Sequence, residues 1–289
     1  MKKFIEIILF SLGVMVLLPG CYMLGKTVLN YRTFDETDVF MWGDSQMYRA
    51  IDMALLDSLP NSFISAAEHG SGVYDFLVFV DEIKPNSNVI IGPSLLHLHR
   101  PKDRDKNNLG ISTWALSLMR ENGYSEMEIL TIVENNGKPR KMFSNRMATY
   151  EAADTIIHIK SIEAFEQQFS SVPEYFSEKA RLSLLGFQKL IEKNCNIIIL
   201  EFPLHPILHE IIDGNSVDSS YQQFNRDLLH LLGIEEEQLV VLSSGKNLMY
   251  DETHLNADGA FLVTKALEKI IQGKVPTLIR FELAENISD

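Results

Sequence analysis

The chain has 289 residues, with 26 Lys and Arg against 39 Asp and Glu, so its formal net charge is −13 at pH 7. This balance argues against a nucleic-acid partner, because a phosphate backbone binds a clustered basic surface. Hydrophobic residues make up 46% and charged residues 22%, which is ordinary for a globular chain and excludes disorder as the main state. The two cysteines, Cys21 and Cys195, are too few for a disulfide framework or a cysteine-based zinc site.

The N-terminal segment has the pattern of a membrane anchor. Lys2 and Lys3 precede a run without charge from Ile7 to Leu24. At about 1.5 Å per residue, this run is close to the shortest helix that spans a bilayer, and it is longer than a usual signal-peptide core. We therefore expect residues 1–26 to be an uncleaved signal anchor and residues 27–37 a linker. The positive-inside rule would keep the lysines cytoplasmic and place the following domain outside the cytoplasm.

Two other interpretations of this segment stay open. Leu18-Pro19-Gly20-Cys21 has the spacing of a lipoprotein cleavage box, in which Cys21 would become the lipidated first residue, although Pro19 fits that pattern poorly. A buried core helix is the third interpretation, and a run behind two N-terminal lysines disfavours it. The signal anchor and the lipoprotein both predict a domain tethered at an extracytoplasmic membrane face.

Short apolar runs alternate with helical patterns along the rest of the chain, which is typical of a parallel α/β sheet. The predicted strands are Asp38–Trp42, Asn61–Ala66, Asn88–Ile91, Asn196–Phe202 and Leu239–Leu242. The predicted helices lie at about Gln46–Leu56, Val73–Ile83, Glu174–Lys193, Tyr221–Leu232 and Ala257–Gln272. This pattern predicts one doubly wound, flavodoxin-like domain over residues 38–275, with a five-stranded parallel sheet in a three-layer α/β/α arrangement.

The regular alternation is interrupted between about His97 and Val172, where the sequence becomes mixed and polar. We expect a partly helical insertion at 97–172. Long insertions at strand ends usually carry function, so this one is expected to shape a substrate cleft. Residues 276–289 are expected to form a C-terminal tail.

Two short blocks carry the chemistry, and both are expected where ligands bind in such folds, at the carboxyl ends of the strands. Ser45 follows Gly43 and Asp44 after the first strand and begins a helix, so its hydroxyl would lie beside free backbone N–H groups. Asp251 and His254 precede the last helix. His254 is the natural base for the Ser45 hydroxyl, and Asp251 could fix the tautomer of its ring, which would complete a Ser-His-Asp triad.

These blocks resemble those of the SGNH or GDSL-like hydrolases, in which a strand is followed by Gly-Asp-Ser and the last block is Asp-x-x-His. Gly43-Asp44-Ser45 matches the first block, and Asp251 and His254 match the last. The blocks are most similar to those of the membrane-anchored branch associated with acylation of cell-envelope polymers. The resemblance covers about Asp38 to Gln272, with the insertion unmatched. It implies Ser45 as nucleophile and as one backbone oxyanion donor.

The second and third blocks of that family supply further oxyanion donors. A glycine N–H from the second block is matched by Gly70 or Gly72, with Gly72 slightly favoured because Val73 begins a helix. The third block is Gly-x-Asn in the family and Gly92-Pro93-Ser94 here, so Ser94 stands at the asparagine position. Loss of a good oxyanion donor can cost ~10²–10³ in rate. This departure leaves room for a slow esterase, a transferase, or a protein that binds without turnover.

Other polar residues near these strand ends are expected to line the substrate cleft. They are Asp44, Gln46, His97 and His205. His205 and His209 have the spacing of a helical metal pair, but Pro206 disfavours a helix there and the internal glutamate of a zincin is missing. We predict no metal site, and the proposed chemistry requires no metal and no organic cofactor.

Two classes of function therefore stay open. The first is an extracytoplasmic, membrane-tethered serine esterase or O-acyltransferase acting on acyl esters of cell-envelope carbohydrate. The alternative is a catalytically weak or inactive domain that binds carbohydrate or serves as an assembly partner of a membrane-bound acyltransferase. Ser45 could then be only a helix cap, and His254 only a ring satisfied by Asp251. Lipid ester hydrolysis at the membrane surface is a third, less specific possibility.

Overall fold

The computed structural model describes residues 37–56, 62–134, 162–235, 239–244, 248–271 and 277–283. The chain divides between Thr37 and Asp38 into two units, and the description below concerns the second unit. The expected anchor at 1–26 and nearly all of the linker at 27–37 lie outside the described residues and stay predictions. Within the described ranges, no helix has the length and apolar character needed to cross a bilayer.

The sheet has six strands in the order β2-β1-β3-β4-β6-β5, and every neighbouring pair is parallel. The strands are β1 Val39–Gly43, β2 Phe63–Ser65, β3 Asn88–Gly92, β4 Asn196–Glu201, β5 Leu239–Ser244 and β6 Thr277–Leu283. The prediction of an α/β fold with a parallel sheet is confirmed, but the prediction of five strands is wrong. Residues 277–283, expected in the C-terminal tail, form β6 between β4 and β5 because Leu278 and Ile279 are buried in the sheet.

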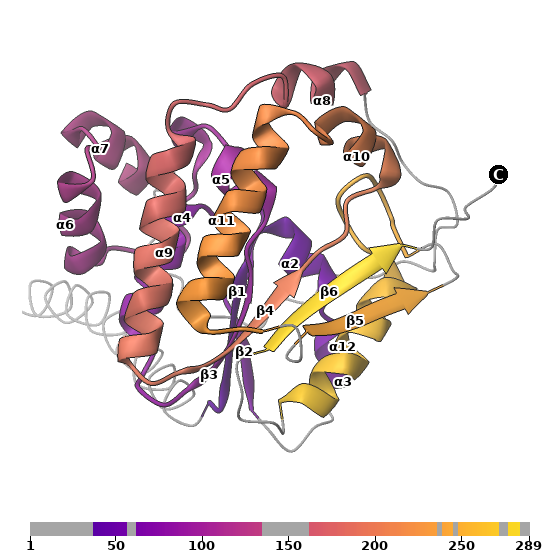
Figure 1. Cartoon of the computed structure of the whole chain (residues 1–289). Helices are drawn as coiled ribbons and strands as arrows, with labels where there is room; N and C mark the ends of the chain where they lie inside the picture. The colour runs from indigo at the N-terminus through magenta and orange to yellow at the C-terminus, as the bar shows by residue number, and fades with distance from the viewer. Residues whose placement is uncertain are drawn as a thin grey trace, which may run out of the picture. The chain divides into compact units, whose positions relative to one another are not determined.

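Helices cover both faces of the sheet (Figure 1). They are α2 Ser45–Ala50, α3 Met53–Leu56, α4 Val73–Glu82, α5 Leu95–His99, α6 Thr113–Glu121, α7 Glu126–Glu134, α8 Ile162–Gln168, α9 Phe176–Glu192, α10 Pro206–Ile212, α11 Ser216–Leu232, α12 Ala257–Ile270 and the 3-10 turn η1 Lys102–Arg104. α4, α9 and α11 lie on one face, and α2, α3 and α12 lie on the other.

Two helix predictions are corrected by capping. The helix expected at 46–56 is two helices, because the Asp52 carboxylate accepts a hydrogen bond from the Leu55 N–H at 3.2 Å and starts α3 afresh. The helix α10 begins at Pro206, where a helix was disfavoured. Proline is tolerated at the first helical position, since its missing N–H would have no partner there.

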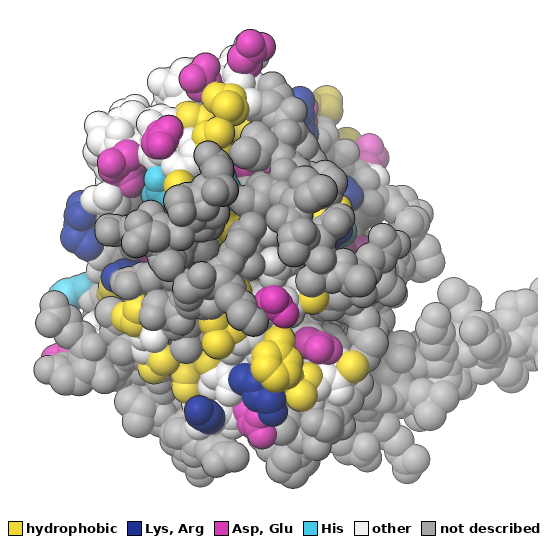
Figure 2. All heavy atoms as spheres, turned by 90° about the vertical axis from the view of Figure 1, so that its right-hand side faces the viewer, with side chains coloured by type: hydrophobic (Ala, Val, Ile, Leu, Met, Phe, Trp, Pro, Cys, Tyr) yellow, Lys and Arg dark blue, Asp and Glu magenta, His cyan; other side chains and the backbone are white. Residues whose placement is uncertain are grey.

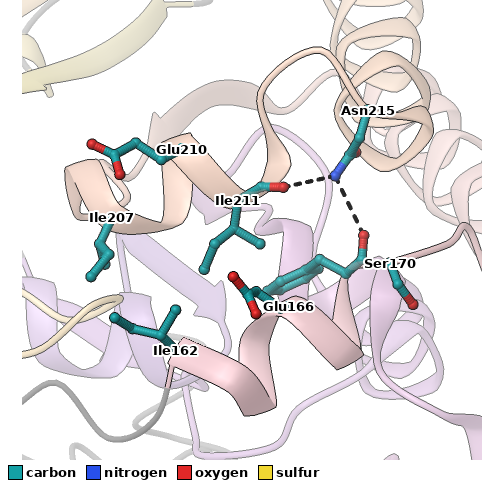
Figure 3. A pocket seen from close by; sticks show the side chains of 8 residues that line it. Ile162, Glu166, Ser170, Ile207, Glu210, Ile211 and Asn215 are labelled. Carbon is teal, nitrogen blue, oxygen red and sulfur yellow. Dashed lines mark hydrogen bonds between the residues drawn. The ribbon is translucent and has the colours of Figure 1, made fainter.

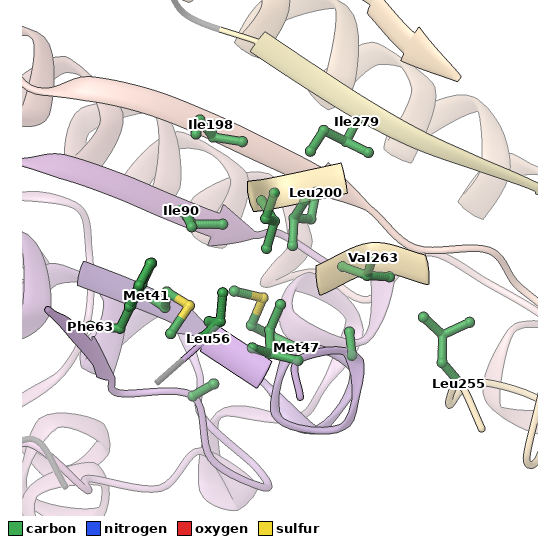
Figure 4. Packing of buried hydrophobic residues seen from close by; sticks show 14 of the residues in the cluster. Met41, Met47, Leu56, Phe63, Ile90, Ile198, Leu200, Leu255, Val263 and Ile279 are labelled. Carbon is green, nitrogen blue, oxygen red and sulfur yellow. The ribbon is translucent and has the colours of Figure 1, made fainter. Parts of the chain in front are cut away.

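The side chains of β1 alternate between two buried cores. On one face, Met41 of β1 packs with Ile90 of β3 and Leu200 of β4. Met47 of α2 and other apolar side chains of the α2 and α12 layer cover them (Figure 4). On the other face, the Trp42 ring lies 4.7 Å from the Phe76 ring of α4. Alternation of this kind is what a strand buried on both faces requires.

The strands β1 and β3 end in register at two glycines, Gly43 and Gly92. A Cβ atom on Gly43 would lie 2.3 Å from Cβ of Met47, and one on Gly92 would lie 2.4 Å from the Phe202 ring. Such distances are too short for any side chain. The two glycines therefore allow α2 to pack directly on the end of the sheet, which sets the position of the first residue of α2, Ser45.

The insertion is partly helical in its described part, as predicted, with residues 135–161 outside the description. A fully buried carboxylate, Asp75 of α4, holds it to the domain. Asp75 accepts hydrogen bonds from Asn108 N at 2.9 Å, Leu109 N at 3.3 Å and Asn108 Nδ2 at 3.0 Å. Burial raises the pKa of Asp75 to about 7 in spite of these hydrogen bonds, which lower it.

The face that carries the β5 edge of the sheet has a mixed surface. In Figure 2, hydrophobic side chains and both signs of charge are interspersed over the described part of this face. Large apolar side chains that reach solvent in the described residues include Val241 of β5, 43% exposed, and Phe261 of α12, 52% exposed. Single exposed apolar residues of this kind are normal and define no binding surface.

Replacement of Asp75 by asparagine should change how stability depends on pH. Between the ordinary carboxyl pKa near 4 and the folded value of about 7, folded Asp75 holds a proton that the unfolded chain has released. The wild-type free energy of unfolding should therefore fall as pH rises through this window, by at most roughly 4 kcal/mol. In Asp75→Asn this contribution should be absent, as measured by urea unfolding from pH 4 to 8.

Asp81→Asn is the matched control, because Asp81 lies on the same helix, is only partly buried and accepts a hydrogen bond from the Ser112 hydroxyl. This control should keep the wild-type pH dependence. An Asp75→Asn variant with the same pH dependence as wild type would show that Asp75 does not titrate in this range.

Candidate active site

The first element of the site is the start of α2, which one carboxylate ties to the neighbouring strand. Asp44 caps α2, since its Oδ1 accepts from Gln46 N at 2.9 Å, and its Oδ2 accepts from the Ser94 hydroxyl at 2.6 Å. Ser94 in turn caps α5 by accepting from His97 N at 3.0 Å. Asp44 is fully buried, so it does not line a cleft as predicted. It fixes Ser45, the next residue, relative to the ends of β1 and β3.

The hydrogen bond from Ser94 to Asp44 also decides whether Ser94 can act as an oxyanion donor. A hydroxyl has a single proton, and Ser94 donates it to Asp44. Ser94 would have to break this short, charge-assisted bond before it could donate to an oxyanion, as its position in the third block suggested. In the arrangement described here, Ser94 is a capping residue, 3% exposed.

The second element is the predicted Asp251–His254 pair, which the structure forms. His254 Nδ1 lies 2.8 Å from each carboxylate oxygen of Asp251. The loop between them is closed by Thr253 N and His254 N, which donate to Asp251 Oδ1 at 2.9 and 2.8 Å. Burial alone would raise the pKa of Asp251, but the hydrogen bonds and charge of His254 outweigh it and hold this pKa below its ordinary value. Asp251 thus stays ionised and orients the ring of His254.

Because Nδ1 is bonded to Asp251, Nε2 is the ring nitrogen of His254 that can accept a proton from a nucleophile. Nε2 is buried and makes no hydrogen bond in the part of the chain that the structure describes, so none joins it to Ser45 Oγ. Such bonds are often long in unliganded sites and tighten when substrate binds. A buried ring nitrogen without a partner costs free energy, which a reacting hydroxyl placed beside it would recover.

A side chain expected in the cleft instead joins these two elements. Gln46 of α2 is 3% exposed, and its Nε2 donates to Thr253 O at 2.8 Å. Gln46 follows Ser45, and Thr253 precedes His254. The bond therefore joins the chain neighbours of the two residues predicted as nucleophile and base, although 207 positions separate the bonded pair.

The structure adds His69, a histidine that the sequence analysis did not single out. Its ring centroid lies 4.9 Å from that of Tyr48 and 6.4 Å from that of His254. Burial first, and then the nearby charges of His254 and Arg49, lower the pKa of His69, which favours its neutral form. The signal for it was its position directly before Gly70 of the second block.

The two candidate oxyanion glycines have different surroundings. Gly70 has a φ of +84° and follows His69, while the Glu68 N–H donates to Gly43 O at 3.3 Å, so this loop runs beside the end of β1. Gly72 caps α4, and a Cβ there would lie 2.4 Å from the Asp105 carboxylate. A Cβ on Gly70 would lie 3.0 Å from the Lys106 side chain and 3.3 Å from Arg100 Nη1, so neither glycine is singled out as the oxyanion donor and both stay candidates.

Of the two histidines predicted for the cleft, one lies in the core. His97 is 1% exposed, stacks edge-on against Trp42 at 5.0 Å between ring centroids, and bonds Ser183 Oγ through Nε2 at 3.1 Å. Its place in the cleft was therefore wrong, because α5 turns its side chain inward. His205 is partly exposed at the cap of α10, and its N–H donates to Glu252 O at 3.0 Å. It lies beside the Asp251–His254 loop.

Two cavities flank α8 at this end of the sheet. One, of about 460 Å³, lies between α8 and α10 and has Glu166 and Glu210 among its lining residues, with Ile162 and Ile207 from the same helices (Figure 3). The other, of about 670 Å³, lies between α5, η1 and α8 and reaches Thr253. Among the described residues, no three His, Cys, Asp or Glu side chains are grouped to hold a metal.

Comparison with known proteins adds little to this geometry. No protein-family model matches the sequence, and no curated protein does. One solved structure, provisionally described as a platelet activating factor from Streptococcus pneumonia, has a TM-score of 0.36 and 11% sequence identity, covering 90% of this chain and 99% of that one. A similarity this low defines neither the fold nor the activity.

Loss of the Gln46 amide should loosen the loop that carries His254. Gln46→Ala removes the bond to Thr253 O and leaves a buried carbonyl without a partner, which should lower the free energy of unfolding by about 1–3 kcal/mol. Hydrogen exchange of residues 251–255 should become faster. Urea unfolding and peptide-level exchange measure the two effects.

Gln222→Ala, which removes an exposed glutamine of α11 that bonds only Asp218 within the described residues, is the matched control and should change neither quantity. Unchanged exchange at 251–255 in Gln46→Ala would mean that this bond does not hold the loop.

Proposed function

We propose that this chain is a serine ester hydrolase or O-acyltransferase, tethered outside the cytoplasm and acting on acyl esters of cell-envelope carbohydrate. The observation that carries the proposal is the Asp251–His254 pair, with Nδ1 held 2.8 Å from the carboxylate and Nε2 buried, on a loop that Gln46 bonds to the helix that Ser45 begins. The resemblance to SGNH-like hydrolases supports the ester chemistry. The apolar N-terminal run and the branch that the two blocks resemble support the envelope location.

In the first half of the reaction, His254 Nε2 takes the proton of Ser45 Oγ as the oxygen attacks the ester carbonyl. Asp251 keeps Nδ1 protonated and stabilises the positive charge that the ring gains. When the tetrahedral intermediate collapses, the C–O bond to the sugar breaks, and Nε2 gives the same proton to the leaving hydroxyl. The products are a free sugar hydroxyl and an acyl group on Ser45.

In the second half, the acyl group leaves Ser45. Water activated by His254 releases a carboxylic acid, or a sugar hydroxyl activated in the same way becomes the new ester. Exclusion of water in favour of a bound sugar distinguishes the transferase from the hydrolase. In both cases the triad returns to its starting protonation state.

Backbone donors at two strand ends are assigned to the oxyanion. The Ser45 N–H lies in the first turn of α2, where backbone N–H groups lack partners within the helix, and the second donor is the N–H of Gly70 or Gly72, in the loop after β2. Ser94 contributes indirectly through Asp44. An oxyanion site with two backbone donors and no asparagine side chain is expected to catalyse ester cleavage more slowly than a site that has all three donors.

A second candidate function follows from the same bond. Since Ser94 donates to Asp44 and no hydrogen bond links Ser45 to His254 in the described residues, the domain could bind acylated carbohydrate without turning it over. It would then act as a partner of a membrane-bound acyltransferase. An intact Asp251–His254 pair disfavours this alternative, because binding alone requires no such pair.

A fluorophosphonate probe should label the purified full-length chain once, at Ser45. The probe forms a P–O bond to Oγ and loses fluoride, which requires an activated hydroxyl. Ser45→Ala should abolish labelling, and His254→Ala and Asp251→Asn should slow it on the order of 10²-fold or more. Intact-mass spectrometry and peptide mapping measure the extent and the position.

Ser216→Ala and His209→Ala are the matched controls, because Ser216 is the first residue of another helix and His209 is an exposed histidine of α10. Both should label like wild type. A folded wild-type chain that labels no faster than Ser45→Ala would refute the enzyme and favour the binding partner.

A further inference from the structure

The larger cavity begins next to the triad. It has a volume of about 670 Å³ and lies between α5 and η1 on one side and α8 on the other. Thr253 lines it, and the Thr253 hydroxyl lies 3.2 Å from His254 Nδ1. The cavity therefore adjoins the loop that carries His254.

Two arginines, Arg100 and Arg104, line the cavity of a chain whose net charge is −13. Neither forms an ion pair with a carboxylate of the described residues; the Arg100 guanidinium makes one long bond, to Ser71 O at 3.5 Å. The nearby Asp105 is paired with Lys179, its Oδ2 lying 2.7 Å from Lys179 Nζ, and the charge of Arg100 also acts on this carboxylate by lowering its pKa against the larger effect of burial, which raises it. The Arg104 guanidinium makes no hydrogen bond within the described residues, and Arg100 has N–H donors beyond the one that bonds Ser71 O, so both can donate to a ligand.

Hydrogen bonds from neighbouring side chains hold the backbone that carries these arginines. Lys179 Nζ donates to Arg100 O at 2.7 Å, and the Tyr175 hydroxyl donates to His99 O at 2.8 Å. The turn η1 is closed by Arg104 N donating to Pro101 O at 3.0 Å. The backbone therefore loses little conformational freedom when an anion arrives, whereas the exposed side chain of Arg104 has to become ordered on binding.

The neighbouring cavity on the other side of α8 has the opposite charge. Glu166 and Glu210 are among its lining residues, and Figure 3 shows their carboxylates on α8 and α10. An anion near this end of the sheet would be repelled there and attracted to Arg100 and Arg104. Among the described residues that line the larger cavity, Glu252 is the one carboxylate; it is 1% exposed and lies two positions before His254.

We propose that this cavity binds an anionic group, a carboxylate or a phosphate, carried by the carbohydrate whose ester lies at Ser45. A planar guanidinium can donate two parallel hydrogen bonds to either group, and the rings of Phe165 and Tyr175 in the same cavity offer apolar faces for sugar rings. The placement of the ester rests on the proposed function. Recognition of the anion does not, and it can be tested in a chain that cannot react.

Binding is measured on the full-length Ser45→Ala chain by calorimetry, with a galacturonate tetramer, a glycerol phosphate tetramer and neutral xylotetraose as probes. At least one anionic probe should bind about tenfold or more tightly than xylotetraose, and this affinity should fall as salt rises. Which anionic probe binds more tightly distinguishes carboxylate from phosphate. Arg104→Gln should weaken binding about tenfold, and Arg100→Gln should do the same.

Arg226→Gln on α11 makes the same change of charge at an exposed position that does not line the cavity, and it should bind like the parent. Thermal unfolding of each variant separates lost binding from lost folding. Equal affinity for neutral and anionic probes, no binding of any probe, or unchanged affinity in both folded arginine variants would each overturn the proposal.

The outcomes also separate this inference from the proposed function. Anion binding that depends on the arginines, together with no fluorophosphonate labelling of wild type, would support the anion site in the cavity and refute the proposed enzyme activity. Labelling at Ser45 with no preference for anionic probes would support the proposed enzyme activity and refute recognition of an anionic group in the cavity.

Discussion

The geometry of the site depends on one buried carboxylate, that of Asp44. A carboxylate without solvent must be compensated by donors, and Asp44 has them on both oxygens: the N–H of Gln46 and the hydroxyl of Ser94. These donors belong to the first turns of two helices that follow neighbouring strands. The carboxylate therefore sets the position of α2 relative to α5, while the paired glycines at the ends of β1 and β3 leave room for both.

Much of the sheet could be predicted from the sequence, because buried parallel strands read as short apolar runs. β6 was missed because Arg280 and Glu282 interrupt its apolar residues after the last helix, although Arg280 Nε pairs with Glu201 at 2.7 Å across the sheet. The start of α10 was missed for a different reason. The rule that proline breaks helices was applied to Pro206, where proline in the first turn costs nothing and His205 supplies the cap.

The site could be predicted only where its partners are close in the sequence. Asp251 and His254 are three residues apart, so the spacing alone proposed the pair that the structure forms. The bonds that place this pair, from Gln46 to Thr253 and from Ser94 to Asp44, join residues 207 and 50 positions apart and leave no local pattern. Without them, Asp44, Gln46 and His97 looked like polar residues free to meet a substrate, and burial is what removes them from the cleft.

The position of β6 has a consequence for how the chain is made. β6 pairs with β4 on one side and β5 on the other, and it follows both in the chain. During synthesis, β4 and β5 therefore emerge with their facing edges unpaired, and neither edge is satisfied until Thr277–Leu283 is available. Sheets that close through such distant contacts fold slowly, and open strand edges invite aggregation. The nascent protein is thus expected to be most prone to aggregation before β6 pairs with β4 and β5.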